Sequence, residues 1–260
     1  MMIELNHLYK SFGENDVLKD IQATFERGKV NFVIGRSGSG KSVMTKCTVG
    51  LIEPDRGYVT YDGRDFTAMS VTQRKAIRRE IGMLFQGSAL FDSMTVEQNV
   101  QFPLRMFSDL SDAEIVRRAA ECLERVELPD AGARFPSECS GGMQKRVGIA
   151  RAIAMNPKYL FCDEPNSGLD PQTAIVIDKL ILDITREYEM TTVVVSHDMN
   201  SVMEASDTIH FVHEGSVLWR GDRSGLLKGG VPELEEFVFA SDLMRQIRQS
   251  PLGKNTELTA

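Results

Sequence analysis

Short apolar runs alternate with longer amphipathic stretches along most of the chain. Residues 30–34, 159–162 and 191–195 are largely apolar runs that end in glycine or polar residues. Such runs are typical of strands buried on both faces of a parallel sheet. Residues 3–9 and 17–25 instead alternate apolar and polar positions, and the stretch 59–65 reads similarly. This second pattern predicts a small antiparallel sheet.

A helical spacing of apolar residues occupies the middle of the chain. Ser111 and Glu114 form the capping-box pattern S-x-x-E, which marks the start of a helix. The residues behind it share one helix face: Ile115, Ala119, Cys122, Leu123 and Val126. A second helix is expected to open near Ser140 and to end before Pro157. The region therefore predicts an inserted helical subdomain at about residues 92–157.

Residues 231–260 form a separate carboxyl-terminal tail. Apolar residues between Pro232 and Gln249 recur at roughly helical spacing, whereas the last ten residues are polar. We expect a helical tail that ends in a flexible segment. A helix that folds back on its own domain and a helix that contacts a neighbouring subunit or a regulator are both compatible with this pattern.

Composition narrows the classes of function. The chain of 260 residues has a formal net charge of -7, which argues against binding to nucleic acid. Its cysteines form no C-x-x-C pair, which favours scattered buried thiols over a zinc site. The sequence shows no secretory signal and no window of about 18 apolar residues. Any membrane-spanning part of a complex is therefore expected from another chain.

A glycine-rich segment follows the first predicted parallel strand and matches the pattern G-x-x-x-x-G-K-[ST] in full. Its residues are Gly35, Arg36, Ser37, Gly38, Ser39, Gly40, Lys41 and Ser42. In such a loop, backbone N–H groups turn toward phosphate oxygens, and the following helix presents its positive dipole end. Lys41 is expected to reach the β- and γ-phosphates, and the hydroxyl of Ser42 to bind Mg2+. The motif predicts binding of a nucleoside triphosphate.

Two acidic residues, Asp163 and Glu164, directly follow the apolar run 159–162. A carboxylate at Asp163 is suited to holding Mg2+, usually through water. Glu164 is suited to act as general base for the attacking water. Two solvated acids at a strand end are the alternative, which the phosphate-binding loop disfavours. The sequence thus predicts an α/β fold with a P-loop NTPase (RecA-like) parallel-sheet core, an antiparallel β subdomain and the helical insertion.

Further residues narrow the class of nucleotide-binding protein by their order and spacing. They are Tyr9, Gln86, Ser140, Gly141, Gly142, the segment 167–170 that ends in Asp170, and His197. With the P-loop, they resemble the pattern of ABC transporter ATP-binding subunits across nearly all of residues 3–225. Taken singly, each also has an ordinary structural reading, such as a half-buried strand aromatic for Tyr9. The resemblance implies an ABC ATPase domain over residues 1–230, followed by the tail.

The resemblance also implies a role for individual residues. Tyr9 would stack on adenine. Gln86 would contact Mg2+ and the attacking water, and would relay to a membrane partner. His197 would contact the γ-phosphate and orient the attack. Asp170 would lie at the junction between subunits.

One chain would then carry two incomplete halves of an active site. In the family, the segment corresponding to Ser140, Gly141 and Gly142 binds the γ-phosphate of ATP held by a second copy. Two subunits would therefore enclose two Mg-ATP in a head-to-tail homodimer. Cys139 and Met143 depart from the usual leucine and glutamine of this motif. The serine and both glycines remain, so ATP hydrolysis is still expected.

The stretch 85–100 favours one group within the family. This stretch and the segment 140–147 look like the ATPase of Mla-type transporters, which work with MCE proteins and move phospholipid across the bacterial envelope. Residues 89–91 would face the permease, or else form a buried hinge of the subdomain. The implied partners are permease chains, an MCE protein and, in some members, a STAS-type regulator. The ATPase would lie on the cytoplasmic face of the inner membrane.

Two other functions remain open at this point. An ATPase for an importer of amino acids or other small solutes uses the same core. A non-transport ABC ATPase that signals to cell-envelope machinery would couple hydrolysis to a partner without moving cargo. A nucleic-acid-associated ABC ATPase is disfavoured by the single cassette and by the acidic charge.

Overall fold

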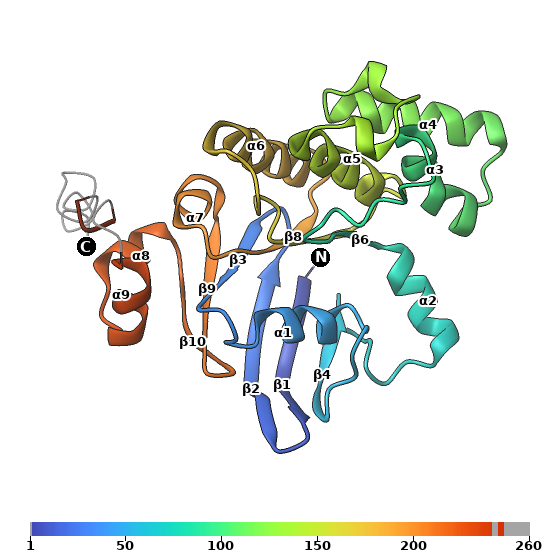
Figure 1. Ribbon diagram of the computed structural model, residues 1–260. Coiled ribbons are helices and arrows are strands. Elements are labelled where there is room, and N and C mark those ends of the chain that lie inside the picture. Colours follow the sequence, from blue (N-terminus) through green and yellow to red (C-terminus); the bar gives the residue numbers. More distant parts are fainter. Residues whose placement is uncertain (1, 241–243, 247–260) are drawn as a thin grey trace.

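The computed structural model describes residues 2–240 and 244–246. Figure 1 shows two β-sheets with helices packed around them. The antiparallel sheet has the strand order β2-β1-β4-β5. Its strands are β1 (Met2–Phe12), β2 (Asn15–Glu26), β4 (Arg56–Tyr61) and β5 (Arg64–Asp65). The stretch 59–65 is thus divided between two strands by the turn at Asp62 and Gly63.

The second sheet has the order β10-β9-β3-β8-β7-β6. Its strands pair in parallel from β9 to β6, and β10 pairs antiparallel with β9. They are β3 (Val30–Ile34), β6 (Ile81–Leu84), β7 (Tyr159–Asp163), β8 (Thr191–Val195), β9 (Thr208–His213) and β10 (Ser216–Gly221). The predicted α/β class with a parallel-sheet core is confirmed.

Helices cover the parallel sheet and form a group of their own at one end of the molecule (Figure 1). The group comprises α3 (Val96–Phe107), α4 (Asp112–Arg125), the short turns Pro129–Ala131 and Pro136–Glu138, and α5 (Gly141–Ile153). The remaining helices are α1 (Lys41–Thr48), α2 (Val71–Arg79), α6 (Pro171–Glu187), α7 (Met199–Ala205), α8 (Arg223–Lys228) and α9 (Pro232–Val238). Ser111 and Glu114 form the expected capping box at the start of α4.

The parallel sheet separates two apolar cores because successive side chains of a strand point to opposite faces. In β3, Phe32 belongs to the core shared with the helical group, α6 and α9. Val33, the next residue, belongs to the core shared with α1 and the antiparallel sheet. Both side chains are at most 1% exposed. The strand is therefore buried on both faces, as its continuous apolar sequence predicts.

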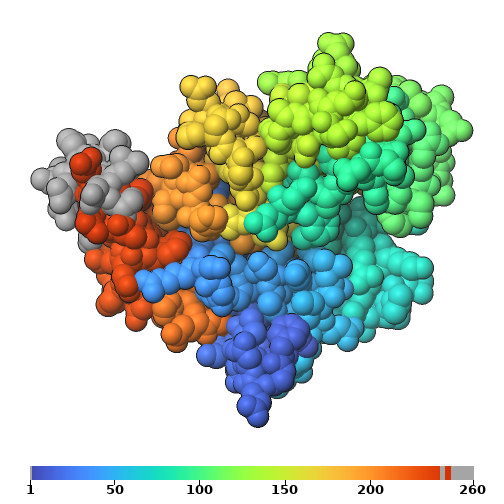
Figure 2. All heavy atoms as spheres, in the orientation of Figure 1, coloured from blue at the N-terminus to red at the C-terminus, as the bar shows by residue number. Residues whose placement is uncertain are grey.

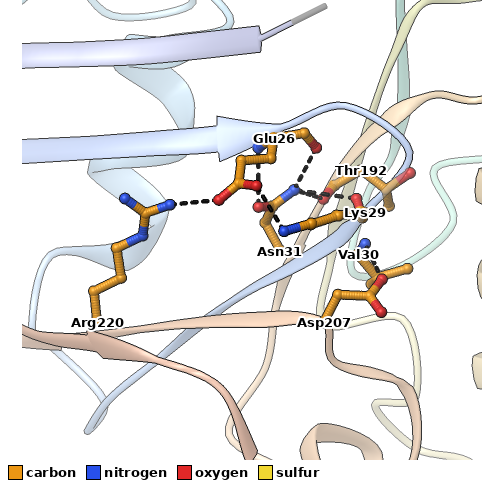
Figure 3. Close-up of polar contacts among 7 residues, drawn as sticks. All are labelled: Glu26, Lys29, Val30, Asn31, Thr192, Asp207 and Arg220. Atoms are coloured by element: carbon orange, nitrogen blue, oxygen red, sulfur yellow. Dashed lines mark hydrogen bonds and ion pairs between the residues drawn. The ribbon is translucent and has the colours of Figure 1, made fainter.

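A buried asparagine joins the two sheets at the start of β3 (Figure 3). Oδ1 of Asn31 accepts a hydrogen bond from the N–H of Glu26, the last residue of β2, at 3.1 Å. Its Nδ2 donates to the carbonyls of Glu26, Lys29 and Thr192 at 3.2, 3.1 and 3.0 Å. Unpaired polar groups are costly to bury, so this network fixes the entry into β3. It thereby helps to position the glycine-rich loop that follows β3.

Helix α9, in the described part of the carboxyl-terminal tail, packs on its own domain, which is one of the two expected arrangements. Leu234 and Val238 of α9 are at most 1% exposed. The ring of Phe237 lies 5.5 Å from the ring of Phe211 in β9, between centroids. α9 ends at Val238, and of the predicted helical stretch beyond it the structure describes residues 239, 240 and 244–246, the last three of which are helical. The expected flexible end of the tail lies outside the described residues.

Candidate active site

Residues 35–42, called the phosphate loop below, connect β3 to α1 at the carboxyl end of the parallel sheet. Gly40 precedes α1 with a φ angle of 106°. A Cβ at this position would lie 3.0 Å from the carbonyl oxygen of Val17. Both the backbone angle and the close approach therefore favour glycine. α1 begins at the next residue, Lys41, so its N-terminus opens onto the loop and favours a bound anion.

The side chain of Lys41 lies inside this loop and is only 8% exposed. Its Nζ donates hydrogen bonds to the carbonyls of Gly35 at 2.7 Å and Arg36 at 2.8 Å. Burial lowers the pKa of Lys41, while the carboxylates of Glu164 and Asp163 act in the opposite direction. The loop thus holds the ammonium group of Lys41 among carbonyl oxygens, in a position suited to contact a bound phosphate group.

A cavity of about 640 Å³ opens beside the phosphate loop. Its volume is in the range of ordinary small-molecule sites. The expected site residues that line it are Gly35, Arg36, Ser37, Gly38, Gly40, Lys41, Ser42, Gln86, Glu164 and His197. Ser39 is not part of this lining and is 8% exposed. The structure therefore brings together most of the residues that the sequence assigned to phosphate binding and hydrolysis.

Glu164 and His197 come together just after the carboxyl ends of the adjacent strands β7 and β8. Nδ1 of His197 lies 2.9 Å from Oε1 of Glu164. The backbone of Glu164 has a φ angle of 48°, and its N–H donates to the carbonyl of Val195 at 2.9 Å. A left-handed non-glycine residue is unusual and is often found at functional sites. This turn takes the carboxylate out of the strand direction and into the cavity lining.

Asp163 lies at the end of β7 and does not line the cavity itself. Burial raises the pKa of Asp163, and the neighbouring charge of Glu164 adds to this effect. Asp163, Ser42 and Gln86 offer carboxylate, hydroxyl and amide oxygens, which are the hard ligands that Mg2+ prefers. Across residues 2–240 and 244–246, no group of three or more His, Cys, Asp or Glu side chains forms a complete metal site. The donor chemistry of Asp163, Ser42 and Gln86 fits Mg2+.

The segment Ser140, Gly141 and Gly142 lies apart from this cavity. Oγ of Ser140 accepts a hydrogen bond from the N–H of Met143 at 3.2 Å and so caps α5. A Cβ at Gly142 would lie 2.5 Å from Cγ2 of Thr173, so the close packing of α5 against α6 requires glycine. None of residues 140–142 lines the cavity of their own chain's phosphate loop.

Asp170 stands beside this segment, at the start of α6. It accepts hydrogen bonds from the N–H and Oγ1 of Thr173 at 3.0 and 2.6 Å, and these bonds lower the pKa of Asp170. A Cβ at Gly141 would lie 3.5 Å from Cδ2 of Leu169. Residues 140–142, 169 and 170 therefore form a second group, which is not part of the lining of the phosphate-loop cavity.

Tyr9 is not brought to the cavity. The guanidinium carbon of Arg56 lies 3.9 Å from the centroid of the Tyr9 ring, so a cation–π contact already covers that ring. Phe12, three residues further along β1, is 49% exposed and pairs with Asn15 in the hairpin that leads to Val17. Val17 does line the cavity. Phe12 is not among the residues that the sequence assigned to nucleotide binding.

The tail also reaches the cavity, which the sequence did not predict. Phe237 of α9 is part of the cavity lining. Arg36 of the phosphate loop forms an ion pair with Glu236 at 2.7 Å. Figure 2 shows the blue phosphate-loop region against the red carboxyl-terminal segment. No sequence motif connects residues so far apart, so only the folded chain shows this contact.

The fold and the cavity define a P-loop ATPase. A sequence model of the family described as "ABC transporter" matches residues 18–167. The probable ribonucleotide transport ATP-binding protein mkl of Mycobacterium tuberculosis (strain H37Rv) is 38% identical over 255 residues, covering 98% of this chain and 69% of the relative. The methionine import ATP-binding protein MetN 1 of Pseudomonas putida is 39% identical over 224 residues, covering 85% of this chain and 67% of the relative.

Solved structures agree with this match. A dimeric post-hydrolysis state of the ATP-binding cassette MJ0796, bound to ADP and Pi, has a TM-score of 0.77 at 32% identity and covers 85% of this chain and 98% of that one. cbiO1 from Clostridium perfringens is part of the ABC transporter complex cbiONQ. It has a TM-score of 0.79 at 28% identity and covers 98% of this chain and 97% of that one. The chain belongs to the ABC transporter ATP-binding family, and it is an ATPase.

Proposed function

We propose that this chain is the ATP-hydrolysing subunit of an ABC transporter that moves phospholipid across the bacterial envelope. One observation carries the catalytic part: Lys41, Glu164 and His197 converge on one cavity, while residues 140–142 lie outside it. The lipid cargo is supported by the likeness of residues 85–100 to the ATPases of Mla-type systems. Besides the permease, the proposed partners of the chain are an MCE protein and a STAS-type regulator.

Hydrolysis is proposed to proceed by in-line attack of water on the γ-phosphate. Lys41 and the backbone of the phosphate loop hold the β- and γ-phosphates and stabilise the charge that develops. Glu164 accepts the proton of the attacking water, and His197 orients the Glu164 carboxylate through their 2.9 Å contact. Mg2+, when bound through Ser42, Asp163 and Gln86, would neutralise phosphate charge.

The outlying position of residues 140–142 supports a head-to-tail homodimer. Each ATP would lie between the phosphate loop of one copy and Ser140, Gly141 and Gly142 of the other. ATP would then hold the two copies together, and loss of the γ-phosphate would release them. Asp170, next to residues 140–142, would lie at the same junction. The base of ATP would stack on Phe12 in place of Tyr9, because Arg56 already covers the Tyr9 ring.

The proposed permease contact is an apolar groove of about 440 Å³ between β6, α3 and α5. Its lining includes Phe85, Ala89, Phe91, Phe102 and Phe107. Phe85 and Phe91 are 39% and 40% exposed, which leaves apolar surface for a partner. The groove adjoins Gln86, so a permease helix seated there would sense the catalytic cavity.

Among the described residues no helix is long and apolar enough to cross a membrane. We therefore place the chain at the cytoplasmic face of the inner membrane through this contact.

A substitution in the groove and a matched one away from it test this contact. Phe91→Glu is expected to abolish co-purification with the permease, because it places a charge in the apolar groove. Leu218→Glu is the matched control, since Leu218 is 44% exposed on β10, at the opposite edge of the sheet from β6. Equal recovery of the permease with both variants would reject the groove as the contact.

A second candidate function is import of a small solute. The names of the mkl and MetN relatives, for ribonucleotide transport and methionine import, favour it. The deciding experiment is to purify the tagged chain with its membrane partners and to reconstitute the complex in liposomes. ATP-driven transfer of labelled phospholipid supports the proposal, with the Glu164→Gln complex as the inactive control. Transport of labelled methionine or ribonucleotide without lipid transfer would replace it with the second function.

A further inference from the structure

Helix α5 contacts both groups of functional residues. Its first turn holds Gly141 and Gly142 beside α6, outside the phosphate-loop cavity. Five residues after Ser140, or about 7.5 Å along the helix, Lys145 lies on the same helix. Lys145 is only 5% exposed, which is unusual for a lysine. A buried ammonium needs hydrogen-bond acceptors to offset the loss of hydration.

Lys145 has its acceptors in the two catalytic loops. Its Nζ donates to the carbonyl of Gln86 and, at 3.3 Å, to the carbonyl of Glu164. Gln86 follows β6 and Glu164 follows β7, and these two strands are neighbours in the parallel sheet. A single side chain thus ties α5 to the loop of Gln86 and to the turn of Glu164.

Two further contacts make α5 and the segment after Gln86 one packed unit. Nη2 and Nη1 of Arg151 donate to the carbonyls of Ser88 and Ala89 at 2.6 and 2.8 Å. A Cβ at Gly148 would lie 2.6 Å from Cδ1 of Leu84, so the helix and β6 are in close contact. Ser88 and Ala89 have φ angles of 60° and 45°, a conformation held by these surroundings. Movement of α5 is therefore expected to move this segment with it.

We propose that Lys145 is a positioning residue that transmits the state of one ATP site of the dimer to the other. Residues 140–142 would contact ATP held by the partner copy, and Lys145 would pass a shift of α5 to Gln86 and Glu164 of its own cavity. This inference rests on the proposed head-to-tail dimer. Within the part of the chain that the structure describes, the hydrogen bonds of Lys145 go to backbone carbonyls, so we assign it an action through Gln86 and Glu164 and no catalytic role.

The test compares three substitutions in the full chain. Lys145→Met removes the donor and keeps an unbranched apolar stem. We expect its kcat to fall at least about tenfold, its affinity for ATP to change less than about threefold, and its Hill coefficient for ATP to drop to about 1. Lys145→Arg keeps a cation and is expected to stay within about threefold of the wild-type kcat. The kcat of Lys145→Gln should lie between those of the other two variants, and this variant provides a readout if Lys145→Met does not fold. Lys179→Met, at an exposed position on α6, is the matched control and should behave as wild type.

The Hill coefficient and the kcat per folded molecule distinguish transmission between the two ATP sites from a purely structural role of Lys145. If Lys145→Met or Lys145→Gln only lowers the unfolding temperature, and both quantities stay at the wild-type values, the inference is wrong. The dimer is tested separately with Glu164→Gln, which should dimerise with ATP whether or not Lys145 is changed. Failure of Glu164→Gln to dimerise would reject the proposed function, whereas dimerisation with unchanged kinetics of Lys145→Met would reject this inference alone.

Discussion

Nδ1 of His197 lies 2.9 Å from Oε1 of Glu164, and the two side chains follow neighbouring strands of the parallel sheet. The Glu164 side chain is 16% exposed and that of His197 is 70% exposed. The carboxylate is therefore sheltered, while the imidazole is largely exposed and lines the cavity. In the proposed mechanism, this pair supplies a base and the group that orients it beside the phosphate loop.

Glu164→Gln tests the assignment of the base. The amide keeps the shape of the side chain and its contact with His197 but cannot accept a proton from water. We expect kcat to fall by about 10² to 10⁴, the usual contribution of a general base, with ATP binding retained. ATP-dependent dimers should accumulate and be visible by size-exclusion chromatography. Turnover at the wild-type rate would remove Glu164 from this role.

Paired alanine substitutions test which aromatic residue stacks on the adenine base of ATP. Phe12→Ala is expected to raise the Kd for ATP about tenfold, because stacking on a base contributes about 1 to 3 kcal/mol. Tyr9→Ala should leave this Kd within about twofold, since Arg56 covers the Tyr9 ring. Fluorescent ATP titration measures both values. The reverse ranking would restore Tyr9 to the position that the family resemblance implied.

The contact between α9 and the rest of the domain predicts an effect on stability. Leu234 is fully buried, so Leu234→Ala should lower the free energy of unfolding by about 2 to 5 kcal/mol. It should also weaken ATP binding, because Phe237 on the same helix lines the cavity. Leu218→Ala, at a 44% exposed position, should change stability by less than about 0.5 kcal/mol. Urea titrations compare the two variants, and equal stability would mean that α9 does not pack as described.

His210 predicts a loss of stability in acid. It is 1% exposed in β9, where burial, and next the charge of Arg220, lower its pKa to about 4. The unfolded chain binds this proton near pH 6.5, so the native state binds fewer protons between the two values. The contribution is fully present above about pH 6.5 and is lost as the pH falls to about 4, at a cost of about 3 kcal/mol. His210→Phe should remove this part of the pH dependence, and parallel stability curves for wild type and variant would contradict it.

The sequence predicted the positions of residues that are set by strand order far better than the positions that are set by packing. The phosphate loop, Glu164 and His197 stand at fixed points after strands, and parallel strands bring such points to one edge of the sheet. Lys145, Phe237 and Phe12 carry no such signal. Their positions depend on how α5, α9 and the first hairpin pack, and these contacts join residues far apart in the chain. Tyr9 shows the same limit, because a neighbouring arginine on another strand covers its ring.

The central claim is that Ser140 acts on ATP held by another copy of the chain, and mixed dimers test it most directly. Lys41→Ala and Ser140→Ala should each be inactive alone, because both sites of each homodimer are damaged. Equal amounts mixed at random give half mixed dimers, each with one intact and one doubly damaged site. Up to about one quarter of the wild-type ATPase rate should therefore return, and coupling between the two sites lowers this fraction. A rate no higher than the average of the two single variants would contradict the shared site.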